Sequence, residues 1–264
     1  MQKPVGGRRI LRLATAWVAI LCATAQLALG DDHPAGNNMD YGTRVEKAYT
    51  AARARYQKDP TSDAAWQFGR ACYDWADYAT KKSDRATISQ EGIDACQKLV
   101  AREPNSAPGH YYLGMDFAEL ARTKMLGALS IVEEMETEFK SVKALDENFD
   151  YGGADRNLGL LYRDAPGWPA SIGNNAKAKE HLVAALKLAP DYPENALNLI
   201  ESELTWGDRD DAAREMKKLD ETWAAAKAKY TGVEWESSWT DWTTRRIDAK
   251  RKIAEVPHPA RPGR

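Results

Sequence analysis

The stretch AKAKEHLVAALKLAPDY, residues 176–192, decides how the rest of the chain is interpreted. Within it, Ala178, Leu182 and Ala185 recur at the spacing that places residues on one face of a helix. The two small alanines allow a neighbouring helix to approach closely, and Leu182 fills the space between the two backbones. Pro190 then stops the helix, because proline lacks the backbone N–H and clashes with the preceding turn. The stretch therefore predicts a short helix that packs against another helix and ends before Pro190.

The same offsets return at three other places, each with three packing residues. The sets are Gly92, Cys96 and Leu99, followed by Pro104; Met135, Phe139 and Val142, followed by Glu147 in place of a proline; and Ala212, Met216 and Leu219. A different pattern, an aromatic residue followed by a Leu-Gly pair and a second aromatic residue, marks the helices that precede these sets. It is found, complete or in part, in His110, Leu113-Gly114 and Phe117; in Leu158-Gly159 and Tyr162; and in Trp66 and Tyr73.

Together these patterns resemble the tetratricopeptide repeat, a helical hairpin of about 34 residues with fixed packing positions and a final proline. The resemblance covers most of residues 60–220 as four hairpins. It implies an all-α fold, a tetratricopeptide-like α-solenoid of divergent repeats. The distance from Pro104 to Pro190 exceeds two ideal repeats, so we expect inserts near residues 123–132 and 165–175.

Helix-breaking residues divide the chain in agreement with this interpretation, because helices commonly end just before them. They are Asp59-Pro60, Glu103-Pro104, the segment 164–169, Ala189-Pro190 and Trp206-Gly207-Asp208.

The N-terminus, residues 1–30, has the pattern of a secretory signal peptide. Arg8, Arg9 and Arg12 precede an uncharged apolar run, and Ala28-Leu29-Gly30 offers small residues for a signal peptidase. We expect cleavage after Gly30 rather than retention as an anchor, because the apolar run is shorter than the roughly 20 residues of a membrane span. The expected location of the mature chain is the periplasm or the exterior.

The remaining segments are predicted from their composition. Residues 31–59 form a polar segment and a first helix, residues 221–256 a Trp-rich C-terminal helix, and residues 257–264 a disordered tail. Trp235, Trp239 and Trp242 share one helical stripe. The stripe either caps the last hairpin, as repeat arrays require, or forms an exposed patch for a partner.

Charge and cysteine content restrict the function. The signal peptide holds four basic residues and no acid, so its removal changes the formal net charge from −2 to −6. An acidic protein lacks the basic footprint of nucleic-acid binding and of attraction to anionic lipid. We therefore expect no nucleic-acid partner, and membrane contact only transiently through the signal peptide. Cys72 and Cys96 form either a disulfide or two buried free thiols.

A narrower resemblance covers the segment from His110 to Met216. This segment is similar to the T component of tripartite (TRAP-type) periplasmic transport systems. The features that carry the resemblance are Tyr111 to Gly114 opening a helix, the long insert after it, the loop APGWPASIG at 165–173, and the helix ending Leu186 to Pro190.

The family implies a periplasmic helical-repeat protein that partners a solute-binding protein. It also implies self-association into an oligomer and a small apolar ligand as variants of that role. Members are often lipid-anchored, but Leu21 before Cys22 does not fit lipoprotein processing, so the anchor does not carry over.

Residues one helical step away from the packing positions form the candidate partner-binding groove. They are Gln67, Asp74, Trp75, Tyr111, Met115, Glu119, Arg156 and Arg163. Aromatic and arginine side chains are typical of binding hot spots, although a solvated helix face would have the same composition. Trp168 either rims the groove or folds back over the insert.

We expect no enzyme, because the sequence shows no metal-ligand motif and no Gly-rich phosphate loop. No cofactor and no metal are expected. The predicted function is an exported helical-repeat adaptor that binds a protein partner or ligand on its concave face. The alternative is a structural scaffold of an envelope assembly that docks through its Trp-rich C-terminus. A hydrolase that uses buried carboxylates is the third alternative, and it requires an acid pair in a cleft.

Overall fold

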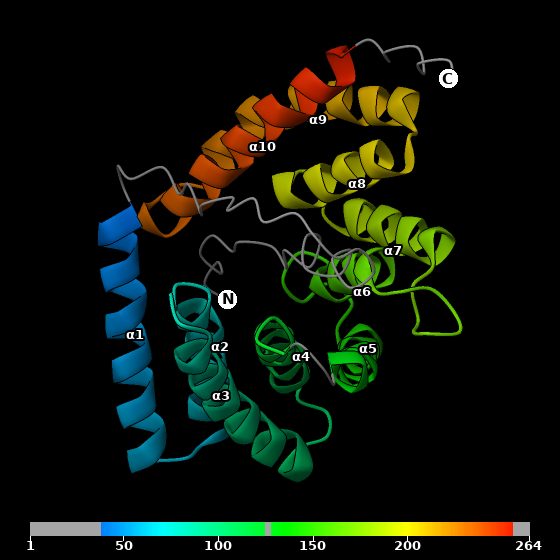
Figure 1. Ribbon diagram of the computed structural model, residues 1–264. Helices are drawn as coiled ribbons and strands as arrows, with labels where there is room; N and C mark the ends of the chain where they lie inside the picture. The colour runs from blue at the N-terminus through cyan, green and yellow to red at the C-terminus, as the bar shows by residue number, and fades with distance from the viewer. Residues whose placement is uncertain (1–37, 125–127, 256–264) are drawn as a thin grey trace. The chain divides into compact units, whose positions relative to one another are not determined.

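The computed structural model describes residues 38–124 and 128–255 (Figure 1). These residues form ten α-helices and a short 3-10 helix, and no β-strand is found among them, so the all-α prediction is confirmed. The predicted signal peptide, its cleavage position and the predicted tail at 257–264 lie outside the described residues. None of the helices in the described ranges combines the length and the apolar character needed to cross a membrane.

The helices follow one another with short connections. Their bounds are α1 Asn38–Lys58, α2 Ser62–Ala76, α3 Lys82–Arg102, α4 Ala107–Ala121, α5 Ala128–Leu145, α6 Gly153–Asp164, α7 Asn175–Leu188, α8 Pro193–Trp206, α9 Arg209–Lys229 and α10 Glu236–Ala254. Helices α1, α3, α6, α7 and α8 each end at or directly before the helix-breaking residues, as the sequence predicts. Side-chain oxygens of Thr61 and Ser106 cap α2 and α4 by accepting from backbone N–H groups three residues on.

The described chain divides into two compact units, one ending at Leu188 and the other starting at Ala189. The first contains α1 to α7, and its helices pair as α2–α3, α4–α5 and α6–α7, with α1 against α2. The second contains the hairpin α8–α9 and helix α10, which lies against both of its helices. The four hairpins predicted for residues 60–220 are therefore all present, divided between the two units.

Each hairpin of the first unit contains a tight contact between a glycine of its first helix and a side chain of its second helix. A Cβ added to Gly114 of α4 would lie 2.7 Å from the Phe139 ring of α5, and one added to Gly159 of α6 would lie 2.7 Å from Leu182 of α7. Gly69 of α2 faces Cys96 of α3 in the same way. The missing side chain lets the two helices of each hairpin approach to this distance.

The packing residues predicted from sequence lie in the core. Met135, Phe139 and Val142 are fully buried, as are Ala178, Leu182 and Ala185. Cys72 and Cys96 are also buried, and both are free thiols. Of the two alternatives for Cys72 and Cys96, the structure therefore has two buried free thiols and no disulfide. Burial raises the pKa of both thiols, so they behave as small apolar groups.

The C-terminal tryptophans form the core of the second unit rather than an exposed patch. Trp235 and Trp242 are almost wholly buried and pack edge-to-face against Tyr192. Residues 221–256 do not form one helix, because α9 continues to Lys229 and a turn with positive φ at Gly232 separates it from α10. Helix α10 thus caps the last hairpin, and the exposed-patch interpretation is wrong.

Candidate functional site

A cluster of buried polar side chains, which we call the Tyr111 cluster, joins α4, α6 and the turn between α5 and α6. Its members are Tyr111, Met115, Asp150, Arg156 and Asn157. The carboxylate of Asp150 accepts hydrogen bonds from the Tyr111 hydroxyl and from Arg156. Arg156 Nη2 also lies 3.1 Å from the Tyr111 oxygen, and Arg156 Nη1 donates to the Asp150 carbonyl at 3.0 Å. Asn157 Nδ2 completes the cluster, 3.1 Å from the Tyr111 oxygen and 3.3 Å from Met115 Sδ.

The backbone before α6 places Asp150 in this cluster. Asp150 and Tyr151 have φ of 53° and 59°, and Gly152 follows with φ of 75°. Such values are uncommon for residues with a side chain and persist only where the surrounding structure holds them. The Asp150–Arg156 ion pair supplies that support, because both side chains are removed from water and each compensates the charge of the other.

A second ionic group lies at the C-terminal end of α4. Glu119 accepts hydrogen bonds from Arg122 at 2.8 and 3.0 Å, and Arg122 also donates to Asp77 at 2.8 Å. Arg85 approaches Glu119 at 3.4 Å. Burial and then the charge of Asp77 raise the pKa of Glu119 to about 7, although Arg122 and Arg85 oppose the shift. This group connects α2, α3 and α4 electrostatically.

One residue of α4 has no partner at all within the described chain. Both oxygens of Asp116 are buried without a hydrogen bond, and they face the backbone of Gly92 on α3. Burial, then the charges of Glu119 and Asp74, raises the pKa of Asp116 well above its usual range. The protonated form is therefore the one that this position favours.

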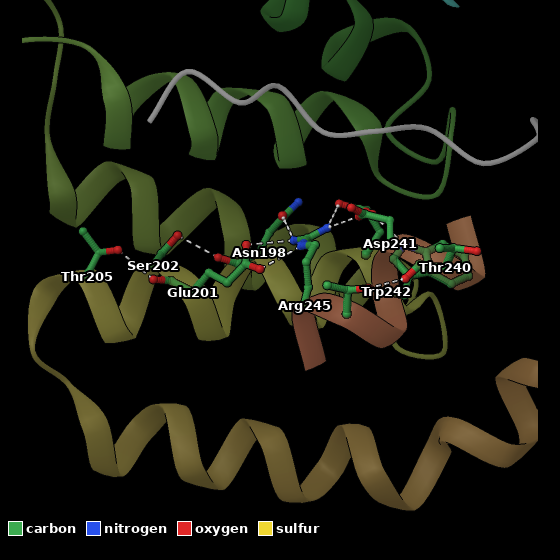
Figure 2. A network of polar contacts seen from close by, with 10 residues as sticks. Asn198, Glu201, Ser202, Thr205, Thr240, Asp241, Trp242 and Arg245 are labelled. Atoms are coloured by element: carbon green, nitrogen blue, oxygen red, sulfur yellow. Dashed lines mark hydrogen bonds and ion pairs between the residues drawn. The ribbon is translucent and has the colours of Figure 1, made fainter. Parts of the chain in front are cut away.

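In the second unit, α8 and α10 are joined by a group that we call the Arg245 cluster (Figure 2). Its members are Glu194, Asn198, Glu201, Asp241 and Arg245. Arg245 donates to Glu201 through Nε at 2.7 Å and through Nη2 at 2.9 Å, a bidentate pair. It also donates to Glu194 at 2.9 Å, to Asp241 at 3.2 Å and to Asn198 Oδ1 at 2.7 Å.

The electrostatics of the Arg245 cluster follow from this arrangement. Burial lowers the pKa of Arg245, but the carboxylates outweigh burial and hold it well above the usual range. Glu194 also accepts a hydrogen bond of 2.6 Å from the indole N–H of Trp242. The cluster therefore fixes α10 to α8, and the guanidinium stays charged at any physiological pH.

The predicted groove residues do not form one surface. The structure brings Tyr111, Met115 and Arg156 together, but in the buried Tyr111 cluster, and it places Glu119 in the ionic group at the end of α4. The remaining four lie apart from these and from one another. Gln67 forms hydrogen bonds with Arg55 and Asp63, and Asp74 forms an ion pair with Arg70. Trp75 packs against the core between α1, α2 and α3, and Arg163 donates to Asp164. Partner binding by these residues stays a prediction.

Trp168 is the most exposed of the predicted site residues. Its side chain is 89% exposed, so it does not fold back over the insert. The loop that carries it is closed by backbone hydrogen bonds from Gly173 N to Pro166 O and from Asn174 N to Tyr162 O, both 2.8 Å. The loop between α6 and α7 thus presents Trp168 from an ordered base.

Several polar residues of these clusters were not predicted from sequence. The turn Asp150-Tyr151-Gly152 has a weak sequence signal, because turn-forming residues precede a helix there. Asn157 lies directly after the predicted Arg156 and has no signal of its own. Glu194, Asn198 and Glu201 share one face of α8 by their spacing, but nothing local connects them to Arg245. No group of three or more potential metal ligands occurs within residues 38–124 and 128–255.

Comparison with known proteins supports the fold. No protein-family model and no curated protein sequence matches the chain. The crystal structure of TTC0263, a thermophilic TPR protein of Thermus thermophilus, is similar with a TM-score of 0.58 and 19% identity, over 81% of this chain and 94% of that one. The crystal structure of MamA is similar with a TM-score of 0.50 and 19% identity, over 75% of this chain and 99% of that one. At this identity the likeness shows a tetratricopeptide-like fold.

Proposed function

We propose that this chain is an exported helical-repeat adaptor that binds a protein partner. The observation that carries the proposal is Trp168, an almost fully exposed tryptophan on a loop closed at its base within a tetratricopeptide-like array. Tryptophan offers a large contact area at a small loss of side-chain freedom, and it is enriched among binding hot spots.

The narrower form of the proposal is the T component of a TRAP-type transport system in the periplasm. It is supported by the signal-peptide pattern at residues 1–30 and by the resemblance of the segment from His110 to Met216. In the structure, Tyr111 to Gly114 lies in the first turns of α4, and the segment 165–173 contains the Trp168 loop. The partner would then be a solute-binding protein, and a small apolar ligand belongs to the same proposal.

An affinity pull-down tests both forms. The full chain is expressed in its own cells with a C-terminal tag, and proteins recovered with it are identified by mass spectrometry. A solute-binding protein or a transporter subunit among them supports the T component, and other envelope proteins alone support only the general adaptor. Recovery of nothing above background contradicts the adaptor. The mass of the purified chain reports whether cleavage follows Gly30.

Two variants make the assay specific for the loop. Trp168→Ala should reduce recovery of the partner without reducing stability, because the side chain makes few contacts with its own chain. Ile247→Ala is the matched control, since it removes another exposed hydrophobic side chain, 61% exposed, from α10. Equal recovery with both variants would mean that the Trp168 loop is not the contact.

A further inference from the structure

His110 connects α5 with the segment that precedes α4, in an arrangement that we call the His110 bridge. Its Nδ1 lies 2.5 Å from a carboxylate oxygen of Glu138 on α5, and its Nε2 lies 2.8 Å from the carbonyl oxygen of Pro104. The side chains of His110 and Glu138 are 12% and 13% exposed, so water still reaches the bridge. Both ring nitrogens therefore face an oxygen atom.

These two contacts require a proton on each ring nitrogen. A backbone carbonyl only accepts, so Nε2 donates to Pro104. An ionised carboxylate also only accepts, so Nδ1 donates to Glu138, and a ring that donates through both nitrogens is the imidazolium cation. The shared proton belongs to the ring, because an imidazolium ordinarily loses its proton about two pH units above a carboxylic acid. The geometry thus indicates the charged form of His110.

Two effects oppose this charge. His110 lies in the first turn of α4, where the positive end of the helix dipole disfavours a cation. Burial also favours the neutral ring. The hydrogen bond with Glu138 outweighs burial and, together with the contact to the Pro104 carbonyl, raises the pKa of His110. The carboxylate of Glu138 is therefore the group that keeps the ring charged.

Ionisable groups on the neighbouring elements are bound elsewhere, are neutral or face water. They are Glu103 beside Pro104, bound to Ser62 and Arg102; Asp63 of α2, bound to Arg55 and Gln67; Cys96 of α3, a buried thiol; and Glu134 of α5, an exposed residue. Loss of the His110 proton is thus felt at Glu138 and Pro104.

We propose that the His110 bridge is a proton-dependent latch, which holds the first turn of α4 to α5 and opens as the pH rises above neutrality. When the ring gives one proton to water, a single N–H remains. Either Nδ1 then turns a lone pair toward the Glu138 carboxylate, or Nε2 turns one toward the Pro104 carbonyl. Two acceptors repel each other, so the ring keeps one contact and loses the other. The inference goes beyond the proposed function and needs no partner.

The backbone around His110 shows where the opening can be observed. Ser106 Oγ accepts from Gly109 N at 3.3 Å, and the backbone N–H of His110 donates to the Ser106 carbonyl at 3.0 Å. A Cβ at Gly109 would lie 2.9 Å from Leu99, so this turn also fits closely on α3. The bridge fastens the same turn to α5, and the amides of Gly109 and His110 therefore report on its opening.

A titration of the four histidines of the full chain tests the protonation. The ring Cε1–Hε1 NMR signals are followed between about pH 5 and pH 10, and the His110 signal is the one missing from His110→Gln. Its midpoint should lie above the ordinary 6.5 and should fall in Glu138→Gln, because the carboxylate is gone. Glu134→Gln, one turn earlier on the exposed face of α5, should leave it unchanged. A wild-type midpoint at or below 6.5, or the same shift in both glutamate variants, would overturn the proposal.

Hydrogen exchange tests the opening itself. Protection factors, which correct for the direct effect of pH on exchange, should fall at Gly109 and His110 by up to about tenfold per pH unit between 6.5 and the midpoint. The fall should be smaller in Glu138→Gln, because a glutamine amide can either donate to Nδ1 or accept from it. It should also be smaller at Ala118, which lies further along α4 and reports unfolding of the whole helix.

The variants keep the outcomes distinct. Urea denaturation first confirms that each variant folds, and if His110→Gln does not fold, the signal that moves in Glu138→Gln identifies His110. Equal falls in protection at Gly109 and Ala118 would mean that α4 unfolds as a whole. Equal falls in the wild type and Glu138→Gln would mean that the bridge is charged but does not hold the turn. Either result would overturn the latch.

Discussion

Gly159 of α6 lies so close to Leu182 of α7 that a Cβ at position 159 would sit 2.7 Å from Leu182 Cγ and 3.1 Å from the Leu182 backbone nitrogen. Non-bonded carbon atoms prefer separations of about 3.5–4.0 Å. The backbone nitrogen cannot move away without moving α7, so the absence of a side chain at position 159 sets the distance between the two helices.

Replacement of Gly159 by alanine should therefore destabilise the first unit. We expect a loss of about 1–3 kcal/mol in the free energy of unfolding, as is typical of overpacked cores. The loss should exceed the roughly 0.5–1 kcal/mol that alanine gains over glycine inside a helix. Urea denaturation followed by circular dichroism measures the change.

Gly42→Ala is the control for this prediction. A Cβ at Gly42 of α1 would come no nearer than 3.6 Å to the Tyr78 ring, which is an ordinary contact. This variant should be unchanged or slightly more stable. If both alanine variants lose the same stability, the close approach of Gly159 and Leu182 does not determine the packing.

The contact between Gly159 and Leu182 could be predicted because both residues belong to a periodic pattern. Gly159 follows Leu158 in the first-helix pattern, and Leu182 is the large residue of the second. Such patterns indicate which face of a helix is buried. The helix ends could be predicted as well, because proline and glycine end a helix through local effects on the backbone.

The polar clusters could not be predicted in this way. Helical periodicity places Tyr111 on an open face, but the rings of Phe139 and Phe149 and the carboxylate of Asp150 enclose it. Asp150 reaches it only through a left-handed turn that no helical period describes. Glu194 and Arg245 are 51 residues apart, and their pairing depends on how α10 lies against α8. Long-range contacts of this kind follow from the tertiary structure alone.

The unpartnered carboxyl of Asp116 should make stability depend on pH. Its pKa is raised in the folded state above the ordinary 3.8, so the folded chain binds the proton more tightly than the unfolded chain. Stability therefore falls as the pH rises from about 4 toward the folded pKa, at up to about 1.4 kcal/mol per pH unit for one group. Asp116→Asn removes this contribution, so its stability relative to the wild type should increase with pH.

Urea midpoints of both proteins between pH 4 and pH 8 check this prediction. Glu119, whose pKa is raised to about 7, acts in the same direction, and because its charge also raises the pKa of Asp116, the difference reports Asp116 together with its interaction with Glu119. Asp94→Asn on the exposed face of α3 serves as the matched control and should show no such trend. A difference between wild type and Asp116→Asn that is constant with pH would contradict the expected role.

The two buried thiols should be unreactive until the chain unfolds. Cys72 and Cys96 are free and buried, and burial raises their pKa values, which reduces the thiolate fraction that reacts. In a Cys22→Ser background, a colourimetric thiol reagent should label neither cysteine in the folded protein and both in urea without reductant. If urea alone releases no thiol and reductant is required, Cys72 and Cys96 form a disulfide.

Arg245 should be the residue on which the stability of the second unit depends most. Methionine at this position matches much of the length of the side chain but removes the guanidinium that the carboxylates of Glu194, Glu201 and Asp241 share. We expect a loss of about 3–5 kcal/mol, the usual effect of removing one partner of a buried ion pair. Arg245→Lys keeps the charge but not the bidentate pair with Glu201, so its loss should be smaller.

The loss caused by Arg245→Met should also depend on pH, and the direction distinguishes charge from packing. Without the guanidinium, the carboxylates next to position 245 repel one another, and this repulsion weakens as the pH falls. The variant should therefore be least stable relative to the wild type near pH 8 and should recover as the pH falls toward 5. Tryptophan fluorescence in urea measures this loss of stability, because Trp235 and Trp242 lie in the core of the same unit.

Arg251→Met, which removes an exposed pair with Glu255, should lower the free energy of unfolding by about 0.5 kcal/mol or less at every pH. A loss at position 245 that stays the same across the pH range would mean that Arg245 stabilises α10 by packing rather than by its charge.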